Sequence, residues 1–95
     1  MISNSIAKQV GHILGIDFKS YPLKLWTKAM NIELEHGSSS GNSITNVTND
    51  DLLLTGKIAL AHILEYPDYY QRLIKMEKEA KKFWKGVPRK RILKL

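Results

Sequence analysis

Cysteine is absent from the 95 residues, proline occurs only three times, and there is no long apolar run. Without cysteine the chain can form neither disulfides nor thiolate metal sites, which are the usual staples of small secreted domains. The run Leu52–Leu54 stops at Thr55, whereas a membrane-spanning helix needs roughly 20 apolar residues. The first residues also lack the basic start and apolar core of a signal peptide. We therefore expect a soluble, intracellular protein with no membrane partner, cytoplasmic or, if its source is a virus, associated with the virion.

Length and composition predict one small domain. A chain of this size buries roughly 60–65% of the surface that its unfolded form exposes, so its stability should be modest. The hydrophobic fraction of 43% is ordinary for a globular protein and too high for a disordered one. We assign residues 1–88 to a single helical domain and residues 89–95 to a basic C-terminal tail.

Hydrophobic spacing predicts four helices and no convincing strand. The expected ranges are about 5–14, from a cap at Ser20 to about 36, about 50–66 and about 67–85. Asn4 or Ser5 should cap the first helix and Gly15 should end it in the left-handed conformation. Thr48 and Asp51 resemble a capping box before the third helix. The fold class is therefore all-α, a small irregular bundle with a long ordered loop between the second and third helices.

Two of these helices show a clear apolar stripe. In the third helix the expected core residues are Leu53, Gly56, Leu60, Ile63 and Leu64. In the fourth they are Tyr69 or Tyr70, Leu73, Met76, Ala80 and Phe83. Gly56 predicts the close approach of another helix, because it has no side chain to hold two backbones apart.

Two short motifs mirror each other along the chain and suggest chemistry. Glu33-Leu-Glu-His36 reads ExxH, and His62-Ile-Leu-Glu65 reads HxxE. Residues three apart share a helix face, so one antiparallel register would bring Glu33 opposite Glu65 and His36 opposite His62. That register makes the third helix overrun the second by about 18 Å, which the intervening loop could span. Glu33 extends the apolar face of its helix, whereas Glu35 points to water, so Glu33 needs a partner.

This cluster has two interpretations. Two carboxylates and two neutral imidazoles suit one divalent zinc, iron or manganese ion, and other residues would then support the four ligands. These supporting residues are Glu35, Asp68, Tyr69 and Tyr70. Alternatively, His36 is a helix C-terminal residue favoured by the dipole and His62 is bonded to Glu33 or Glu65, which locks two helices together. We identify no catalytic residue, and an enzyme is the least favoured reading.

Positive charge gathers at the C-terminal end of the chain. The net charge is +6, and residues 75–94 hold nine Lys and Arg against Glu77 and Glu79, so the first 74 residues are about neutral. This asymmetry favours a partner such as nucleic acid or an acidic protein surface, although a solvated helix face is the alternative. The expected polyanion-binding residues are Lys78, Lys82, Lys85, Arg89, Lys90 and Arg91. No specific nucleic-acid reader is visible, so such binding should be salt-sensitive and independent of sequence.

Several strings between residues 26 and 80 resemble a small uncharacterised domain family of bacteria, phages and giant viruses. They are ELEHG (33–37), TNVTNDD (45–51), TGKIALAHILEYPDYYQRL (55–73) and KMEKEA (75–80). The resemblance implies that the Glu/His cluster, together with Glu35, Asp68, Tyr69 and Tyr70, belongs to the family signature. It leaves the first 20 residues and the basic tail outside the family.

These observations favour a non-enzymatic helical module whose Glu/His cluster either binds one divalent metal or locks two helices. The alternative is a basic accessory protein that binds nucleic acid, or packs in a viral or ribonucleoprotein assembly, through its C-terminal end. The sequence leaves the oligomeric state open.

Overall fold

The computed structural model describes residues 1–37 and 46–86, except for the side chain of His36. It contains four α-helices and one 3₁₀ turn: α1 Asn4–Leu14, α2 Leu23–Glu33, η1 Leu34–His36, α3 Leu52–Glu65 and α4 Tyr69–Trp84. No strand occurs in the described ranges, so the predicted all-α class is confirmed. Most of the predicted long loop, residues 38–45, lies outside the described residues. The predicted tail, 89–95, lies outside them as well.

Helix α1 begins one residue earlier than expected. The hydroxyl of Ser3, rather than Asn4 or Ser5, accepts a hydrogen bond from the Ile6 amide at 3.2 Å. At the other end Gly15 adopts φ +83°, the left-handed conformation that was predicted for it. Glycine reaches this conformation without a steric penalty, so it ends the helix cleanly.

The caps of the next two long helices differ from the prediction. Ser20 caps nothing, because its hydroxyl donates to the Asp17 carboxylate and α2 instead starts directly after Pro22. Helix α3 is capped by the Asp51 carboxylate, which accepts from the Leu54 amide at 2.8 Å. Thr48 is buried in the preceding turn, where its hydroxyl accepts from the Asp50 amide at 3.3 Å. A carboxylate is a good N-cap, since the first amides of a helix carry partial positive charge.

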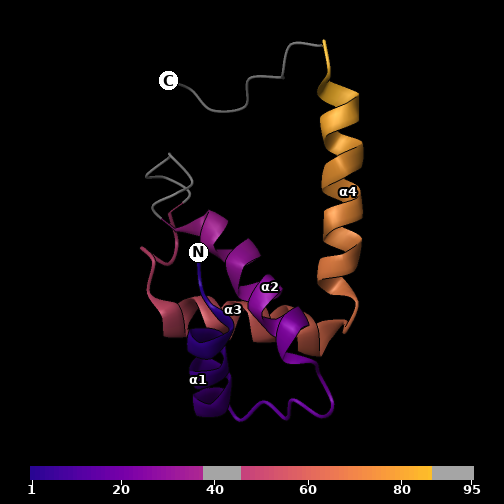
Figure 1. The fold of residues 1–95 in the computed structure, drawn as a ribbon. Coiled ribbons are helices and arrows are strands. Elements are labelled where there is room, and N and C mark those ends of the chain that lie inside the picture. Colours follow the sequence, from indigo (N-terminus) through magenta and orange to yellow (C-terminus); the bar gives the residue numbers. More distant parts are fainter. Residues whose placement is uncertain (38–45, 87–95) are drawn as a thin grey trace.

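Helices α1, α2 and α3 pack around Trp26, which is fully buried. Its indole nitrogen donates to the Ala7 carbonyl at 2.8 Å, so the large ring is buried with its polar atom satisfied. The predicted close approach at Gly56 is confirmed: a β-carbon there would lie 2.7 Å from a methyl group of Val10. These three helices form the body of the protein (Figure 1).

Helix α4 leaves the body, and this corrects part of the predicted core. Its upper turns stand clear of the other helices (Figure 1). All of α4 lies in the described part of the chain, and Tyr70 is its one buried residue. Met76 is 53% exposed and Phe83 67% exposed, although both were expected to face inward. In α3, Leu53 and Leu64 are likewise exposed, although both were expected in the core.

Candidate functional site

The predicted inward position of Glu33 is confirmed. Glu33 is the last residue of α2 and is only 2% exposed, whereas Glu35, two residues later, is exposed. The carboxylate continues the apolar face of the helix that also buries Trp26 and Met30. Burying a carboxylate is costly unless hydrogen-bond donors or opposite charges surround it. The neighbours of Glu33 therefore define the candidate site.

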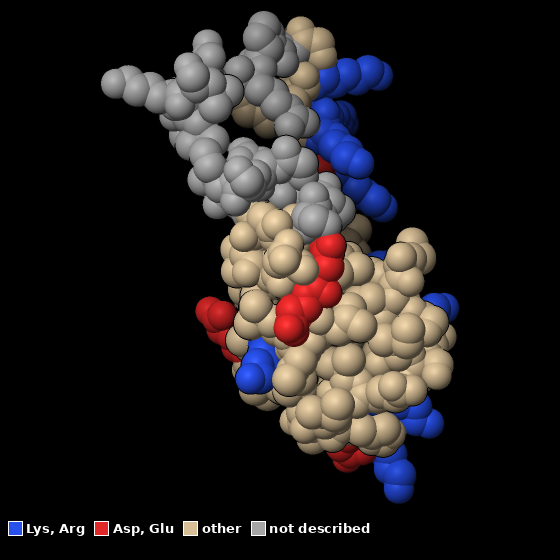
Figure 2. All heavy atoms as spheres, turned by 90° about the vertical axis from the view of Figure 1, so that its left-hand side faces the viewer, with Lys and Arg blue, Asp and Glu red and all other residues tan. Residues whose placement is uncertain are grey.

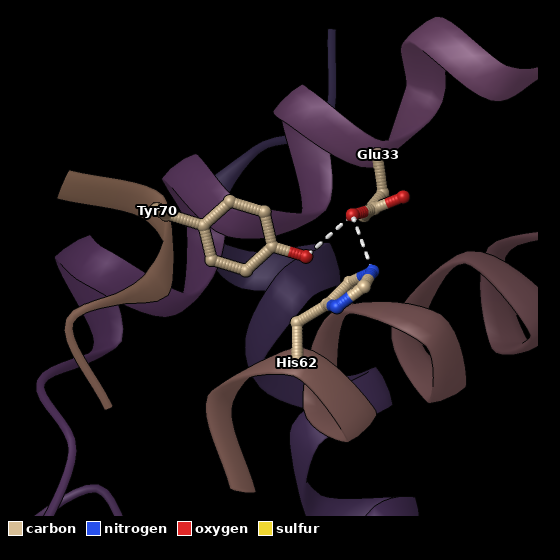
Figure 3. Close-up of polar contacts among 3 residues, drawn as sticks. All are labelled: Glu33, His62 and Tyr70. Carbon is tan, nitrogen blue, oxygen red and sulfur yellow. Dashed lines mark hydrogen bonds and ion pairs between the residues drawn. The ribbon is translucent and has the colours of Figure 1, made fainter. Parts of the chain in front are cut away.

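Tyr70 provides a hydrogen bond from the first turn of α4. Its hydroxyl donates to Glu33 Oε1 at 2.6 Å, a short distance that is typical of a hydroxyl bonded to a carboxylate (Figure 3). The Tyr70 side chain is 3% exposed. Burial raises the pKa of the Tyr70 hydroxyl far above its ordinary value, and the hydrogen bond and negative charge of Glu33 raise it further. The burial of Tyr70 agrees with the expectation that Tyr69 or Tyr70 belongs to the core.

His62 faces the same carboxylate from α3. Its Nε2 atom lies 3.8 Å from Glu33 Oε1, within range of an ion pair when the imidazole is protonated but too long for a hydrogen bond (Figure 3). The ring of Tyr69 stacks on the imidazole with centroids 4.1 Å apart and planes at 4°. Tyr70 meets the same imidazole edge-on at 6.2 Å. The His62 side chain remains 32% exposed, so the imidazole lies at the edge of the buried site.

We call Glu33, His62 and Tyr70 the Glu33 junction. The three residues come from α2, α3 and α4, so one buried carboxylate joins three helices. Because Tyr70 is the buried residue of α4, the junction also fixes the base of the helix that leaves the body. Glu33 and His62 therefore face each other as the helix-lock interpretation expected, but at 3.8 Å a bond between them stays a prediction, and the hydrogen bond at this carboxylate comes from Tyr70 of a third helix.

The other residues assigned to a metal site lie apart from the junction or outside the described residues. Glu33 meets His62 and not Glu65, which is exposed at the end of α3. The side chain of His36 lies outside the described residues. Within the described part of the chain, no group of three or more His, Asp and Glu side chains is arranged to hold a metal ion. The four-residue metal site therefore stays a prediction.

Of the four residues expected to support the ligands, two contact His62 and the other two are placed beside other residues. Tyr69 and Tyr70 contact the His62 ring as described above. Asp68 is exposed and acts on Tyr21: burial raises the pKa of the Tyr21 hydroxyl, and the charge of Asp68 raises it further. Glu35 lines a shallow hollow beside Lys81 and Trp84 of α4.

The lysines of α4 form a second feature, which we call the basic face. It consists of Lys75, Lys78, Lys81, Lys82 and Lys85, the last being the residue that follows α4. All five are exposed. Figure 2 shows Lys and Arg gathered along one edge of the projecting part, while the body below presents mainly uncharged atoms. Of the predicted polyanion-binding residues, Lys78, Lys82 and Lys85 are thus on this face, and Arg89, Lys90 and Arg91 lie outside the described residues.

The fold and the junction define a small all-α domain in which three helices form a body and a fourth projects from it. Residues 7–79 match the model of a family described as a protein of unknown function, DUF5661. Because the match covers well over half of the chain, the protein belongs to this family. The match begins in α1, so the expectation that the first 20 residues lie outside the family was wrong for residues 7–20.

The match contains the whole Glu33 junction and ends at Glu79, inside α4. Lys81, Lys82 and Lys85 of the basic face therefore follow the matched segment. Comparisons with curated proteins and with solved structures each found no significant match. No helix in the described ranges is long and apolar enough to cross a membrane.

Proposed function

We propose that the protein is a non-enzymatic helical binding module that uses the basic face of α4 to bind nucleic acid. The observation that carries this proposal is the geometry of α4. At 100° per residue, the five lysines occupy an arc of about 120° on one side of a helix that stands away from the body (Figure 1). Such an exposed row of cations can lie along a phosphate backbone, with Lys81 bordering the hollow that Glu35 lines.

Lysine contacts phosphates as a point charge and lacks the planar fork of arginine. No specific nucleic-acid reader is visible in the sequence, so we expect binding that is independent of sequence. Phe83 lies off the lysine arc, against Trp84 with ring centroids 4.9 Å apart, so base stacking does not accompany the phosphate contacts. Binding should therefore be driven by counterion release. With five contacts to duplex DNA, log K should fall with log salt with a slope of up to about −4.5.

A triple variant tests this proposal. In Lys75→Gln/Lys78→Gln/Lys82→Gln, affinity for a labelled DNA duplex should fall at least tenfold and the salt slope should become shallower by about 1 per lysine removed. The matched control is Lys8→Gln/Lys19→Gln/Lys24→Gln, which removes the same charge from exposed positions outside α4. Fluorescence anisotropy at several salt concentrations measures both quantities. Equal losses in the two variants would reject a specific role for the basic face.

The C-terminal tail and the kind of polyanion need separate measurements. A chain ending at Gly86 keeps the five lysines and should retain most of the affinity; complete loss would move the binding site to residues 87–95. Binding to polyglutamate in preference to DNA would replace nucleic acid by an acidic protein as the partner. The expected spread of the family among phages and giant viruses, and a place in a viral or ribonucleoprotein assembly, remain expectations that are compatible with this function.

The Glu33 junction supports a second candidate, a site for zinc, iron or manganese. Glu33 and His62 come from different helices and face each other across 3.8 Å, and His36 and Glu65 are the predicted remaining ligands. Metal analysis of protein purified without a histidine tag tests this candidate, together with the change in melting temperature on adding each metal. Metal-free protein whose melting temperature does not respond would leave the junction as a helix lock alone.

A further inference from the structure

Helix α4 carries an apolar seam with the spacing of a coiled coil. Every step from one seam residue to the next is four or three positions, which is the a/d alternation of a heptad repeat. The seam consists of Tyr69, Leu73, Met76, Ala80 and Phe83. Its outer part is open to solvent, with Met76 and Phe83 more than half exposed.

The charged residues of α4 also follow the heptad. The five lysines of the basic face fall at the outer positions b, c and f, which point away from a paired helix. Arg72 and Glu79 fall at the same flanking position of successive heptads, beside the seam. Packing of Tyr69 and Leu73 against the core of the body accounts for the lower part of this seam, whereas Met76 and Phe83 above them are exposed.

A hollow and a protruding ring lie at opposite ends of this seam. At the base, a hollow of about 280 Å³ is lined by Tyr66, Tyr69, Arg72, Leu73 and Met76. The Arg72 guanidinium covers the Tyr66 ring at 4.7 Å from its centroid. At the far end Phe83 is 67% exposed. The two lie on one face of the helix, about 21 Å apart along its axis if measured from Tyr69.

We propose that α4 pairs antiparallel with α4 of a second copy of the protein. In a two-fold symmetric pair, Phe83 of each copy enters the hollow of the other, because the hollow and the ring exchange places when the helix is reversed. The matching register sets Leu73 against Met76 of the second copy and Tyr66 against Phe83 of the second copy, since both pairs of residue numbers have the sum 149.

Charge complementarity supports this partner and this register. In this register Arg72 lies beside Glu79 of the second copy. By the two-fold symmetry, Glu79 also lies beside Arg72 of the second copy. The two bodies then lie at opposite ends of the helix pair, and both basic faces point outward. A parallel pair would bring Arg72 to Glu77 of the second copy instead, and it would leave Phe83 far from the hollow.

The proposed dimer does not depend on the proposed function, and dimerisation is measured on the protein alone, without nucleic acid. The seam is short, little more than two heptads, so association should be weak and should depend on protein concentration between about 1 µM and 1 mM. Sedimentation equilibrium over this range should give a monomer–dimer curve. A protein that stays monomeric throughout overturns the proposal, whatever the result of the DNA experiments.

Substitution of the seam and of its flanks tests the arrangement. Phe83→Ser should weaken dimerisation at least tenfold, whereas Lys82→Ser, at an outer position, should leave it unchanged. Arg72→Glu alone and Glu79→Arg alone should each weaken it at least threefold, and Arg72→Glu/Glu79→Arg should restore it. Circular dichroism confirms that each variant keeps its helices. Failure of the double variant to recover overturns the antiparallel register, because no parallel pair joins positions 72 and 79.

Truncation of the chain distinguishes the second copy from another possible occupant of the seam, residues 87–95 of the same chain. If the seam is covered by residues 87–95 of its own chain, a chain ending at Gly86 will dimerise while the complete chain stays monomeric, and that result overturns the proposal. Equal dimerisation of both chains supports it.

Discussion

The body and the projecting helix α4 use similar side chains to different ends. In the body, Trp26, Ala29, Met30 and Ala59 are fully buried and come from α2 and α3. In α4, Tyr69 and Leu73 at the base of an equally regular apolar seam pack against the core of the body, whereas Met76 and Phe83 are exposed. The difference shows that amphipathic spacing states which face of a helix is apolar, but not whether that face packs inside its own chain. Most of the buried core therefore belongs to the body, and Tyr70 is the only member of it in the described residues of α4.

The largest expected difference between the two regions comes from deleting one aromatic ring in each. Trp26→Ala should lower the free energy of unfolding by about 3–5 kcal/mol, because it opens a cavity among three helices and removes the hydrogen bond to Ala7. Phe83→Ala should change it by no more than about 0.5 kcal/mol, because that ring is already largely in solvent. Urea unfolding followed by circular dichroism measures both. Similar losses in the two variants would mean that α4 is packed as firmly as the body.

A smaller effect is expected where the two regions meet. Tyr70→Phe keeps the buried ring but removes the hydroxyl that donates to Glu33, which should cost about 1.5–3 kcal/mol. Amides of α4 should lose more protection from hydrogen exchange than those of α1, because the junction fixes the base of α4. Tyr69→Phe is the control, since the Tyr69 hydroxyl has no hydrogen-bond partner in the described part of the chain. An equal loss in both variants would show that ring packing, and not the hydrogen bond, joins α4 to the body.

The smallest effect concerns alkaline pH. The pKa values of Tyr70 and Tyr21 are raised in the folded protein from their ordinary value of 10.0. Below about pH 10 both hydroxyls are protonated in the folded and the unfolded chain, so their contribution to stability is complete. Above that pH the unfolded chain loses these protons while the folded chain keeps them, so the free energy of unfolding falls as pH rises. Unfolding curves between pH 8 and pH 11 should show this fall, and it should be weaker in Tyr70→Phe; an identical slope would remove Tyr70 as a cause.

Local patterns were sufficient to predict the helices, because a helix is specified by its own periodicity and by the residues at its ends. Gly15 ends α1 as expected, and Gly56 marks the contact with Val10. The caps were less predictable: Ser3 and Asp51 were chosen over neighbouring residues of similar propensity. Several polar side chains near a helix start can serve as a cap, and the path of the chain before the helix selects one of them.

The candidate site was predictable only in part. The position of Glu33 on an apolar face indicated a buried carboxylate that needs a partner, and His62 was one of the expected partners. Tyr70 was expected only as one of four residues that support the Glu/His cluster, and its hydrogen bond to Glu33 in particular was not predicted. Its position 37 residues away in the sequence carries no local signal, and the contact depends on the angle at which α4 leaves α3.

The sequence by itself determined an all-α chain, the buried character of Glu33, the accumulation of positive charge toward the C-terminal end and the apolar seam of α4. These properties follow from composition and from spacing along single helices. Only the tertiary structure decided that Tyr70 completes the Glu33 junction and that the seam of α4 remains largely open. Both depend on how helices distant in sequence meet in space, and the spacing of residues within one helix does not contain that information.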